Sequence, residues 1–178
     1  MGIERQRPCT ILEGLPTLPA SSPGISRERA YTIRQMQPGD LDEIMRIWLE
    51  SNRQAHSFIP ASYWEEKSAA VRELIKQAEI YTALCGEALA GFVGLTDGYI
   101  AGIFVSEAFR EQGIGTALLA EAKRRFSELS LHVYVKNEQA VQFYENEKFY
   151  VCEKMTEEET KEEEYLMRWR GTGEKAEK

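Results

Sequence analysis

The stretch "FREQGIGTALL", residues 109–119, places two glycines one residue apart directly before an apolar, helix-like run. A helix N-terminus offers N–H groups without intrahelical partners and a partial positive charge, and phosphate oxygens suit both. Gly113 and Gly115 lack the Cβ atoms that would hold a pyrophosphate away from those N–H groups. Arg110 adds a cationic fork just upstream. The stretch therefore predicts a pyrophosphate-binding loop at the start of a helix.

Two other nucleotide-binding motifs and a purely structural role compete with this interpretation. No Gly-Lys-Ser/Thr sequence follows the glycines, which disfavours a Walker loop, and Leu118 stands where the dinucleotide fingerprint has Gly or Ala. The residues alone are equally compatible with glycines that serve only a tight strand-to-helix turn.

The chain upstream of the loop predicts one strand, two helices and three further strands. Residues 31–36 have the pattern of a first strand. Asp40 with Glu43, and Ser62 with Glu65, have the spacing of capping boxes, and apolar residues follow each pair at helical spacing. The next segments are rich in β-forming residues and are joined by Gly86-Glu87 and by the hairpin signal Asp97-Gly98; they are residues 79–85, 88–96 and 99–105.

The chain downstream of the loop alternates helices and strands. Apolar residues from Ile114 to Leu129 predict a third helix, and residues 131–135 a strand. Asn137 is expected to cap a fourth helix that runs through Tyr144. Two closing strands, residues 149–155 and 164–170, flank the acidic run 156–164, which we interpret as a solvated hairpin tip.

This order of elements predicts an α/β (α+β) domain with a mixed, mostly antiparallel sheet of about six or seven strands and helices on both faces. We expect one domain at residues 30–170, a flexible extension at residues 1–29 and a flexible tail at residues 171–178.

Composition narrows the classes of partner. The 178-residue chain carries a formal net charge of −7, and its Lys and Arg residues form no basic stripe, so we expect no nucleic-acid partner. An acidic surface suits a cationic acceptor such as an amine, and it equally suits solubility alone. Cys9, Cys85 and Cys152 give no pattern of a disulfide framework or zinc cluster. No apolar segment is long enough to span a membrane, so we expect a cytoplasmic protein.

Two blocks of the sequence resemble the GNAT superfamily of N-acetyltransferases. The segment 104–119 is similar to the acetyl-CoA loop of that family, Arg/Gln-x-x-Gly-x-Gly/Ala, with Arg110, Gly113 and Gly115 at its fixed positions. The second block, "LHVYVKNEQAVQFYENEKF", residues 131–149, is similar to the strand and helix that follow this loop in the family. The blocks occur in the family's order and spacing.

The resemblance, which covers roughly residues 31–170, implies the fold, the activity and the cofactor. It implies a GNAT-like sheet with four helices, and transfer of the acetyl group of acetyl-CoA to a primary amine by direct attack in a ternary complex, without a metal. The segment 48–64 further resembles small bacterial members that act on amines or protein amino groups. A protein lysine, a protein N-terminus and a small amine all remain open as acceptors.

The resemblance also assigns residues to the site. Tyr144 is implied as the general acid, because a phenol with a pKa of about 10 keeps its hydrogen at neutral pH and can share it with a developing thiolate. The implied cofactor contacts, which include main-chain N–H groups as the oxyanion donors, are Ile103, Phe104, Val105, Arg110, Glu111, Gln112, Gly113, Ile114, Gly115, Thr116, Asn137, Ala140 and Tyr144.

The general base stays open at this point. His56 lies in the loop where the resemblance places the acceptor and is our first candidate, with His132 and Glu107 as the alternatives. Aromatic side chains near His56, namely Phe58, Tyr63 and Trp64, fit either an acceptor pocket or the core.

Three further expectations complete the interpretation. Lys148 stands where the family has Gly, and if its backbone is left-handed this costs on the order of 1 kcal/mol of stability. Exposed edge strands are compatible with a homodimer. The alternative function is a non-catalytic module that binds acyl-CoA to regulate a partner.

Overall fold

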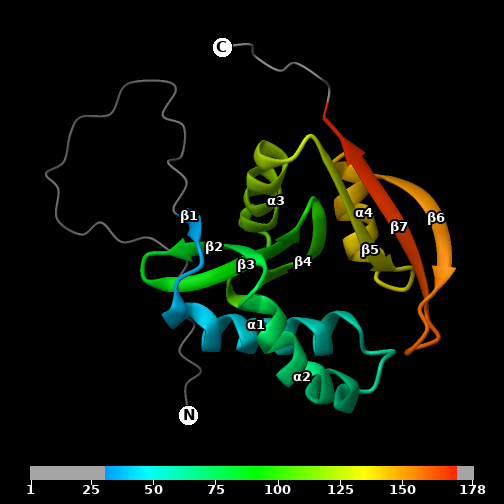
Figure 1. Cartoon of the computed structure of the whole chain (residues 1–178), viewed down its shortest axis with the longest axis horizontal. Coiled ribbons are helices and arrows are strands. Elements are labelled where there is room, and N and C mark those ends of the chain that lie inside the picture. The colour runs from blue at the N-terminus through cyan, green and yellow to red at the C-terminus, as the bar shows by residue number, and fades with distance from the viewer. Residues whose placement is uncertain (1–30, 172–178) are drawn as a thin grey trace, which may run out of the picture.

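The computed structural model describes residues 31–171, so the expected extension at residues 1–29 and residues 172–178 of the expected tail lie outside the described residues. The described chain forms a seven-stranded sheet with four α-helices (Figure 1). Its strands are β1 (Thr32–Gln35), β2 (Glu79–Cys85), β3 (Ala88–Thr96), β4 (Tyr99–Val105), β5 (Glu128–Tyr134), β6 (Tyr150–Thr156) and β7 (Glu163–Arg170). Its helices are α1 (Leu41–Ala55), α2 (Ala61–Ile75), α3 (Ile114–Arg125) and α4 (Glu138–Asn146), with short 3-10 turns at η1 (Pro38–Asp40) and η2 (Glu107–Phe109). The predicted order of elements and the fold class are confirmed.

The sheet consists of two antiparallel halves that meet at one narrow point. The strand order is β1-β2-β3-β4-β5-β7-β6, and β4 pairs with β5 in parallel through Tyr99 and Ser130 alone. In the β3–β4 ladder Gly94 pairs with Gly102 but Leu95 pairs with Ile100, which leaves Ala101 as the extra residue of a bulge. Because a bulge bends its strand, β4 turns away from β5 directly after their shared pair.

Helices cover both faces of the sheet, as predicted. Helices α1 and α2 bury one apolar cluster that includes Ile44, Ile47 and Trp48, while α3 and α4 bury a second one that includes Leu118 and Tyr144. In Figure 1, α1 and α2 lie below the β1–β4 half and α3 lies above it. The two clusters fix the end of α1 and the beginnings of α3 and α4 around the place where β4 leaves β5.

The structure corrects several local predictions. Neither predicted capping box forms, because Asp40 ends η1, where it accepts from Gln37 N–H and pairs with Arg34, while Ser62 lies inside α2 after an N-cap at Pro60. The third helix ends at Arg125 and not near residue 129, since the chain is already extended at residue 126 and β5 begins at residue 128.

Cys152 has a free, exposed thiol on β6.

Helix α4 is fastened at both of its ends. At the start, Asn137 Oδ1 accepts the Ala140 N–H at 3.2 Å, so the predicted N-cap is confirmed. At the end, Phe149 N–H donates to Tyr144 O at 2.9 Å and Lys148 N–H to Glu145 O at 3.0 Å, which is the Schellman pattern. The Phe149 ring also packs on the Tyr144 ring, with centroids 5.4 Å apart. These contacts fix Tyr144 in the last turn of the helix.

Lys148 occupies the left-handed position of this motif, with φ of 71°. We expect Lys148→Gly to raise the free energy of unfolding by about 1 kcal/mol, because glycine adopts this conformation without the Cβ clash. Urea unfolding of both proteins measures the change. Lys148→Ala is the control: it keeps the Cβ and should bring no gain, and an equal gain in both variants would contradict the backbone explanation.

Candidate active site

A cavity of about 450 Å³ opens where β4 and β5 separate. Its lining comes from the end of α1, the second half of β4, the loop that leads into α3 with the first turn of that helix, and α4. The predicted residues that line it are His56, Ile103, Phe104, Val105, Arg110, Glu111, Gly113, Ile114, Gly115, Thr116, Asn137, Ala140 and Tyr144. Residues distant in the sequence are thus brought to one place.

One wall of the cavity is an unpaired strand edge. Ser106 N–H donates to Ala90 O at 2.9 Å, toward β3. Since polar main-chain groups alternate along an antiparallel ladder, those of Ile103 and Val105 point the other way, to the side that β5 has left. The Val105 carbonyl accordingly accepts from Arg110 Nε, at 3.4 Å. This edge can receive a second extended, amide-bearing chain.

A second wall is the N-terminus of α3. Its N-cap is Gly113 with φ of 78°, no side chain caps the helix, and the first turn carries no acidic residue. The first internal bond of α3 runs from Ala117 N–H to Gly113 O, so the N–H groups of the preceding residues have no partner within the helix. A Cβ on Gly113 would meet no atom within 4 Å, so the space beside this residue is open.

The loop before α3 has an unusual backbone. Glu111 has φ of 61°, so two residues of this short loop, Glu111 and Gly113, are left-handed. Left-handed residues in a turn direct successive N–H groups to one side and form concavities that bind anions. The loop and the helix terminus together have the donors and the partial charge that a diphosphate requires.

Tyr144 reaches the cavity from α4 and is only 7% exposed. Burial raises the pKa of its phenol well above the ordinary 10, and the nearby Tyr99 contributes in the same direction. The Tyr144 hydroxyl is therefore fully protonated at neutral pH, in the state that donates a hydrogen bond.

His56 follows α1 and lies among aromatic rings. It stacks on Trp64 with centroids 5.3 Å apart and makes edge contacts with Phe58 and Tyr134. Its Nε2 lies 3.2 Å from Asn137 Nδ2. Burial lowers the pKa of the imidazole from 6.5 to about 4, so the ring is neutral at pH 7.

Comparison with known proteins agrees with this geometry. Residues 41–149 match the model of the acetyltransferase (GNAT) family. The chain belongs to the GNAT acetyltransferases. It is an enzyme that uses acetyl-CoA as the acetyl donor, which confirms the predicted enzyme class and cofactor against the alternative of a non-catalytic module.

Individual relatives of this GNAT chain support the same assignment. It is 33% identical over 139 residues to the peptidyl-lysine N-acetyltransferase YiaC of Escherichia coli (strain K12), a match that covers 77% of this chain and 95% of YiaC. The solution structure of apo YjaB from Escherichia coli is similar, with a TM-score of 0.71 and 26% identity over 80% of this chain and 99% of that one. The PaiA N-acetyltransferase of Thermoplasma acidophilum, solved with coenzyme A, shares the fold, with a TM-score of 0.64 and 19% identity over 79% of this chain and 98% of that one.

Three of the predicted residues of the GNAT chain lie away from the cavity. Gln112 is exposed and donates to Ala108 O at 3.2 Å. His132 is exposed on β5, where its Nδ1 lies 3.1 Å from the Tyr99 hydroxyl, and Glu107 accepts from Gln54 Nε2 at 3.0 Å. Neither alternative base therefore lines the cavity.

Sequence reasoning missed Gln54, which joins α1 to the loop before α3. Its Oε1 accepts from Arg110 Nη2 at 2.6 Å, while its Nε2 donates to Glu107. Nothing in its surroundings along the sequence indicates this, because the contact exists only when α1 packs beside the loop. Phe143, another lining residue, had a signal: it directly precedes Tyr144 in the quoted second block.

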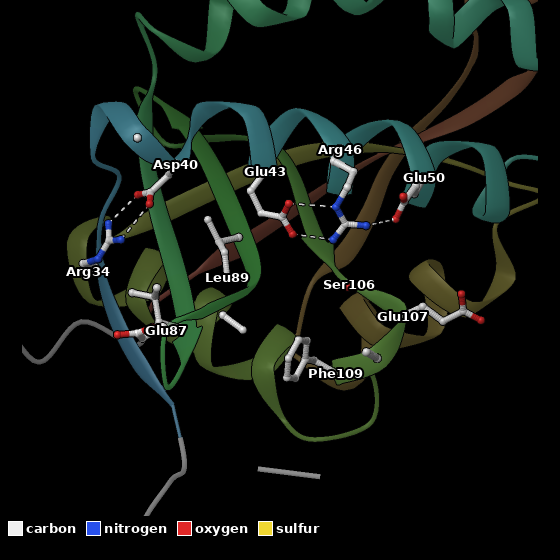
Figure 2. A pocket seen from close by; sticks show the side chains of 14 residues that line it. Arg34, Asp40, Glu43, Arg46, Glu50, Glu87, Leu89, Ser106, Glu107 and Phe109 are labelled. Carbon is white, nitrogen blue, oxygen red and sulfur yellow. Dashed lines mark hydrogen bonds and ion pairs between the residues drawn. The ribbon is translucent and has the colours of Figure 1, made fainter. Parts of the chain in front are cut away.

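A larger hollow, of about 800 Å³, lies beside α1 on the surface and contains none of the predicted cofactor residues (Figure 2). Five of its charged side chains pair with each other, Arg34 with Asp40, and Arg46 with both Glu43 and Glu50, while Glu87 and Glu107 line it outside these pairs. Residues 31–171 hold no group of His, Cys, Asp or Glu that could bind a metal ion. None of the helices in that part of the chain has the length and apolar character needed to cross a membrane.

The lowered pKa of His56 makes stability depend on pH. Between pH 6.5 and about 4 the unfolded chain binds a proton at His56 that the folded GNAT domain does not. The free energy of unfolding is therefore unaffected by this group above pH 6.5 and decreases as the pH falls from 6.5 to about 4. Over that range the free energy of unfolding of the wild type should decrease by up to about 3 kcal/mol more than that of His56→Gln. Urea unfolding at pH 4, 5, 6 and 7 measures the difference between the proteins, and parallel curves would show that His56 titrates normally.

Proposed function

We propose that this enzyme acetylates the side-chain amine of protein lysines by direct attack on acetyl-CoA in a ternary complex, with Tyr144 as the general acid. One observation carries the proposal: a buried, protonated phenol lines the same cavity as the open edge of β4 and the uncapped N-terminus of α3. These three features meet three requirements of acetyl transfer, namely a proton donor, a main-chain track for the thioester arm and an anchor for its diphosphate.

The donor is oriented by the main chain. The diphosphate accepts from N–H groups at the start of α3 and from Arg110, whose guanidinium is within reach of both the loop and β4. The amide-bearing arm pairs with the free edge at Ile103 and Val105. Main-chain N–H groups of this edge then face the thioester carbonyl, where negative charge develops during attack.

In the reaction the lysine nitrogen attacks the thioester carbon, the new C–N bond forms and the C–S bond breaks. Tyr144 shares its proton with the sulfur as negative charge develops there, because its pKa, raised by burial, keeps the hydroxyl protonated until that moment. The proton that the amine loses on attack replaces the one that Tyr144 gives. The products are an amide and a free thiol, so protons and electrons balance.

The choice of lysine rests on the similarity to enzymes named peptidyl-lysine N-acetyltransferases and on the charge of the hairpin that packs against α2. The hairpin between β6 and β7 carries Glu157, Glu158, Glu159 and Glu162. Its Glu159 accepts from the Tyr63 hydroxyl at 2.8 Å and from Lys67 Nζ at 2.7 Å, which holds the hairpin against α2. Glu159 pairs with Lys67 and Glu162 with Lys136, so Glu157 and Glu158 are the carboxylates of the hairpin left to attract a cationic side chain from solvent.

Tyr144→Phe tests the acid role. It removes the hydroxyl and keeps the ring, so we expect kcat to fall at least tenfold while the Kd for acetyl-CoA changes less than about twofold. Release of free thiol with an Nα-acetylated lysine peptide measures kcat, and calorimetry measures Kd. Tyr150→Phe, which removes an exposed hydroxyl on β6, serves as the control. Unaltered turnover in Tyr144→Phe would remove the acid role, and activity with spermidine but not with the peptide would refute the lysine acceptor.

Gly113→Ala tests the diphosphate anchor. We expect it to weaken acetyl-CoA binding at least tenfold, because its Cβ enters the space in front of the N–H groups and the left-handed backbone resists the change. Gly86→Ala is a matched control, since Gly86 has φ of 61° and open space around it but lies in the β2–β3 turn. Calorimetric titration compares the three proteins. Equal affinities would refute the anchor, and equal weakening in both variants would attribute the loss to stability.

A further inference from the structure

We propose that His56 is a positioning residue for Asn137 and not the general base. Its imidazole accepts a hydrogen bond from the side chain that caps α4, and so holds the start of that helix, and Tyr144 on it, against the end of α1. The inference concerns how Tyr144 is positioned and rests on the proposed function for its kinetic consequence.

The hydrogen-bond network fixes the direction of this bond. Asn137 Oδ1 is the acceptor for Ala140 N–H, so its amide nitrogen Nδ2 is the atom that faces His56. An amide NH₂ can only donate, hence His56 Nε2 must accept and the imidazole proton must lie on Nδ1. The lone pair that a base would use is therefore already engaged by Asn137.

The surroundings of the ring keep it in this state. His56 is enclosed by the rings of Trp64, Phe58 and Tyr134, and burial among them lowers the pKa of the imidazole. It thus stays neutral, and able to accept, at all pH values near neutrality. The same lowered pKa makes the ring a weak acceptor of the proton of an amine.

The unpaired nitrogen of His56 argues against a role in packing alone. Among residues 31–171 the buried side-chain nitrogens without a hydrogen-bond partner are His56 Nδ1 and Trp64 Nε1. A buried N–H without a partner is costly, and a phenylalanine would fill the same aromatic surroundings without that cost. What His56 adds is the accepting Nε2, and Asn137 is its partner.

The experiment compares His56→Gln with His56→Phe. The Gln side-chain oxygen can take the position of Nε2 and accept from Asn137, but it cannot act as a base, whereas Phe keeps the aromatic packing and cannot accept. We expect His56→Gln to retain kcat within about threefold and to keep the pH profile of kcat/KM, and His56→Phe to lower kcat about tenfold or more. The kcat of the double variant His56→Phe/Asn137→Ala should be no lower than the kcat of Asn137→Ala alone.

A base role would give a different result. Both substitutions at His56 would then lower kcat alike, and the acid limb of the pH profile would disappear in His56→Gln. Losses that add in the double variant would also overturn the proposal, because the two side chains would then act independently.

Hydrogen exchange of the Ala140 amide tests the same inference without any turnover. We expect slow exchange in the wild type and in His56→Gln, and faster exchange in His56→Phe and Asn137→Ala, in the absence of acetyl-CoA. Equal rates in all four proteins would refute the positioning role. A wild type that shows this exchange pattern but transfers no acetyl group would refute the proposed function and leave the contact between His56 and Asn137 supported.

Discussion

The separation of β4 from β5 is the constraint on which the rest of the molecule depends. A parallel pair of strands that stayed together would satisfy its main-chain groups internally and leave no room between α1 and α4. Here the bulge at Ala101 ends the pairing after Tyr99 and Ser130, and polar groups of β4 remain without a strand partner inside the domain. Free main-chain groups at the centre of a sheet are costly unless something pairs with them. In the proposed complex, the extended arm of acetyl-CoA supplies these partners.

Helix α4 shows how the fold converts this opening into a site of defined geometry. The helix has only nine residues, too few to be stable by itself, and its position depends on tertiary contacts and on its two ends. Asn137 closes its first turn, and Phe149 and Lys148 close its last one. Tyr144 lies between these two ends and has little freedom. The left-handed backbone of Lys148 is tolerated because the contact between the Tyr144 and Phe149 rings stabilises the same turn.

The parts that the sequence predicted are those with a local physical cause. Glycines before an apolar helix, the Asp97-Gly98 turn and the cap at Asn137 each express a preference of a few consecutive residues, and each is found in the structure. The predicted capping box at Asp40 does not form because its carboxylate pairs with Arg34, six residues away. The one at Ser62 does not form because α2 begins directly after Pro60, which places Ser62 inside the helix.

The parts that could not be predicted depend on pairs of distant residues. A register shift opposite Gly94 leaves no pattern in the sequence of β4 itself, so the residue pattern did not predict the opening between the strands. The bond between His56 and Asn137 joins residues 81 positions apart, and that between Gln54 and Arg110 joins residues 56 apart. Residue type placed His56 among the candidates for a base, whereas its hydrogen-bond partner decides what the ring can do.

The acidic hairpin tip has a mechanical consequence. The two halves of the sheet share one strand pair at their centre. The contact of Glu159 with Tyr63 and Lys67 is a second connection between them, because it joins the β6–β7 hairpin to α2. The charged groups of Lys67 and Glu159 are both exposed to water, so dissolved ions weaken their interaction. The strength with which α2 and the β6–β7 hairpin hold together is therefore tied to ionic strength, whereas the packing of the two buried apolar clusters is not.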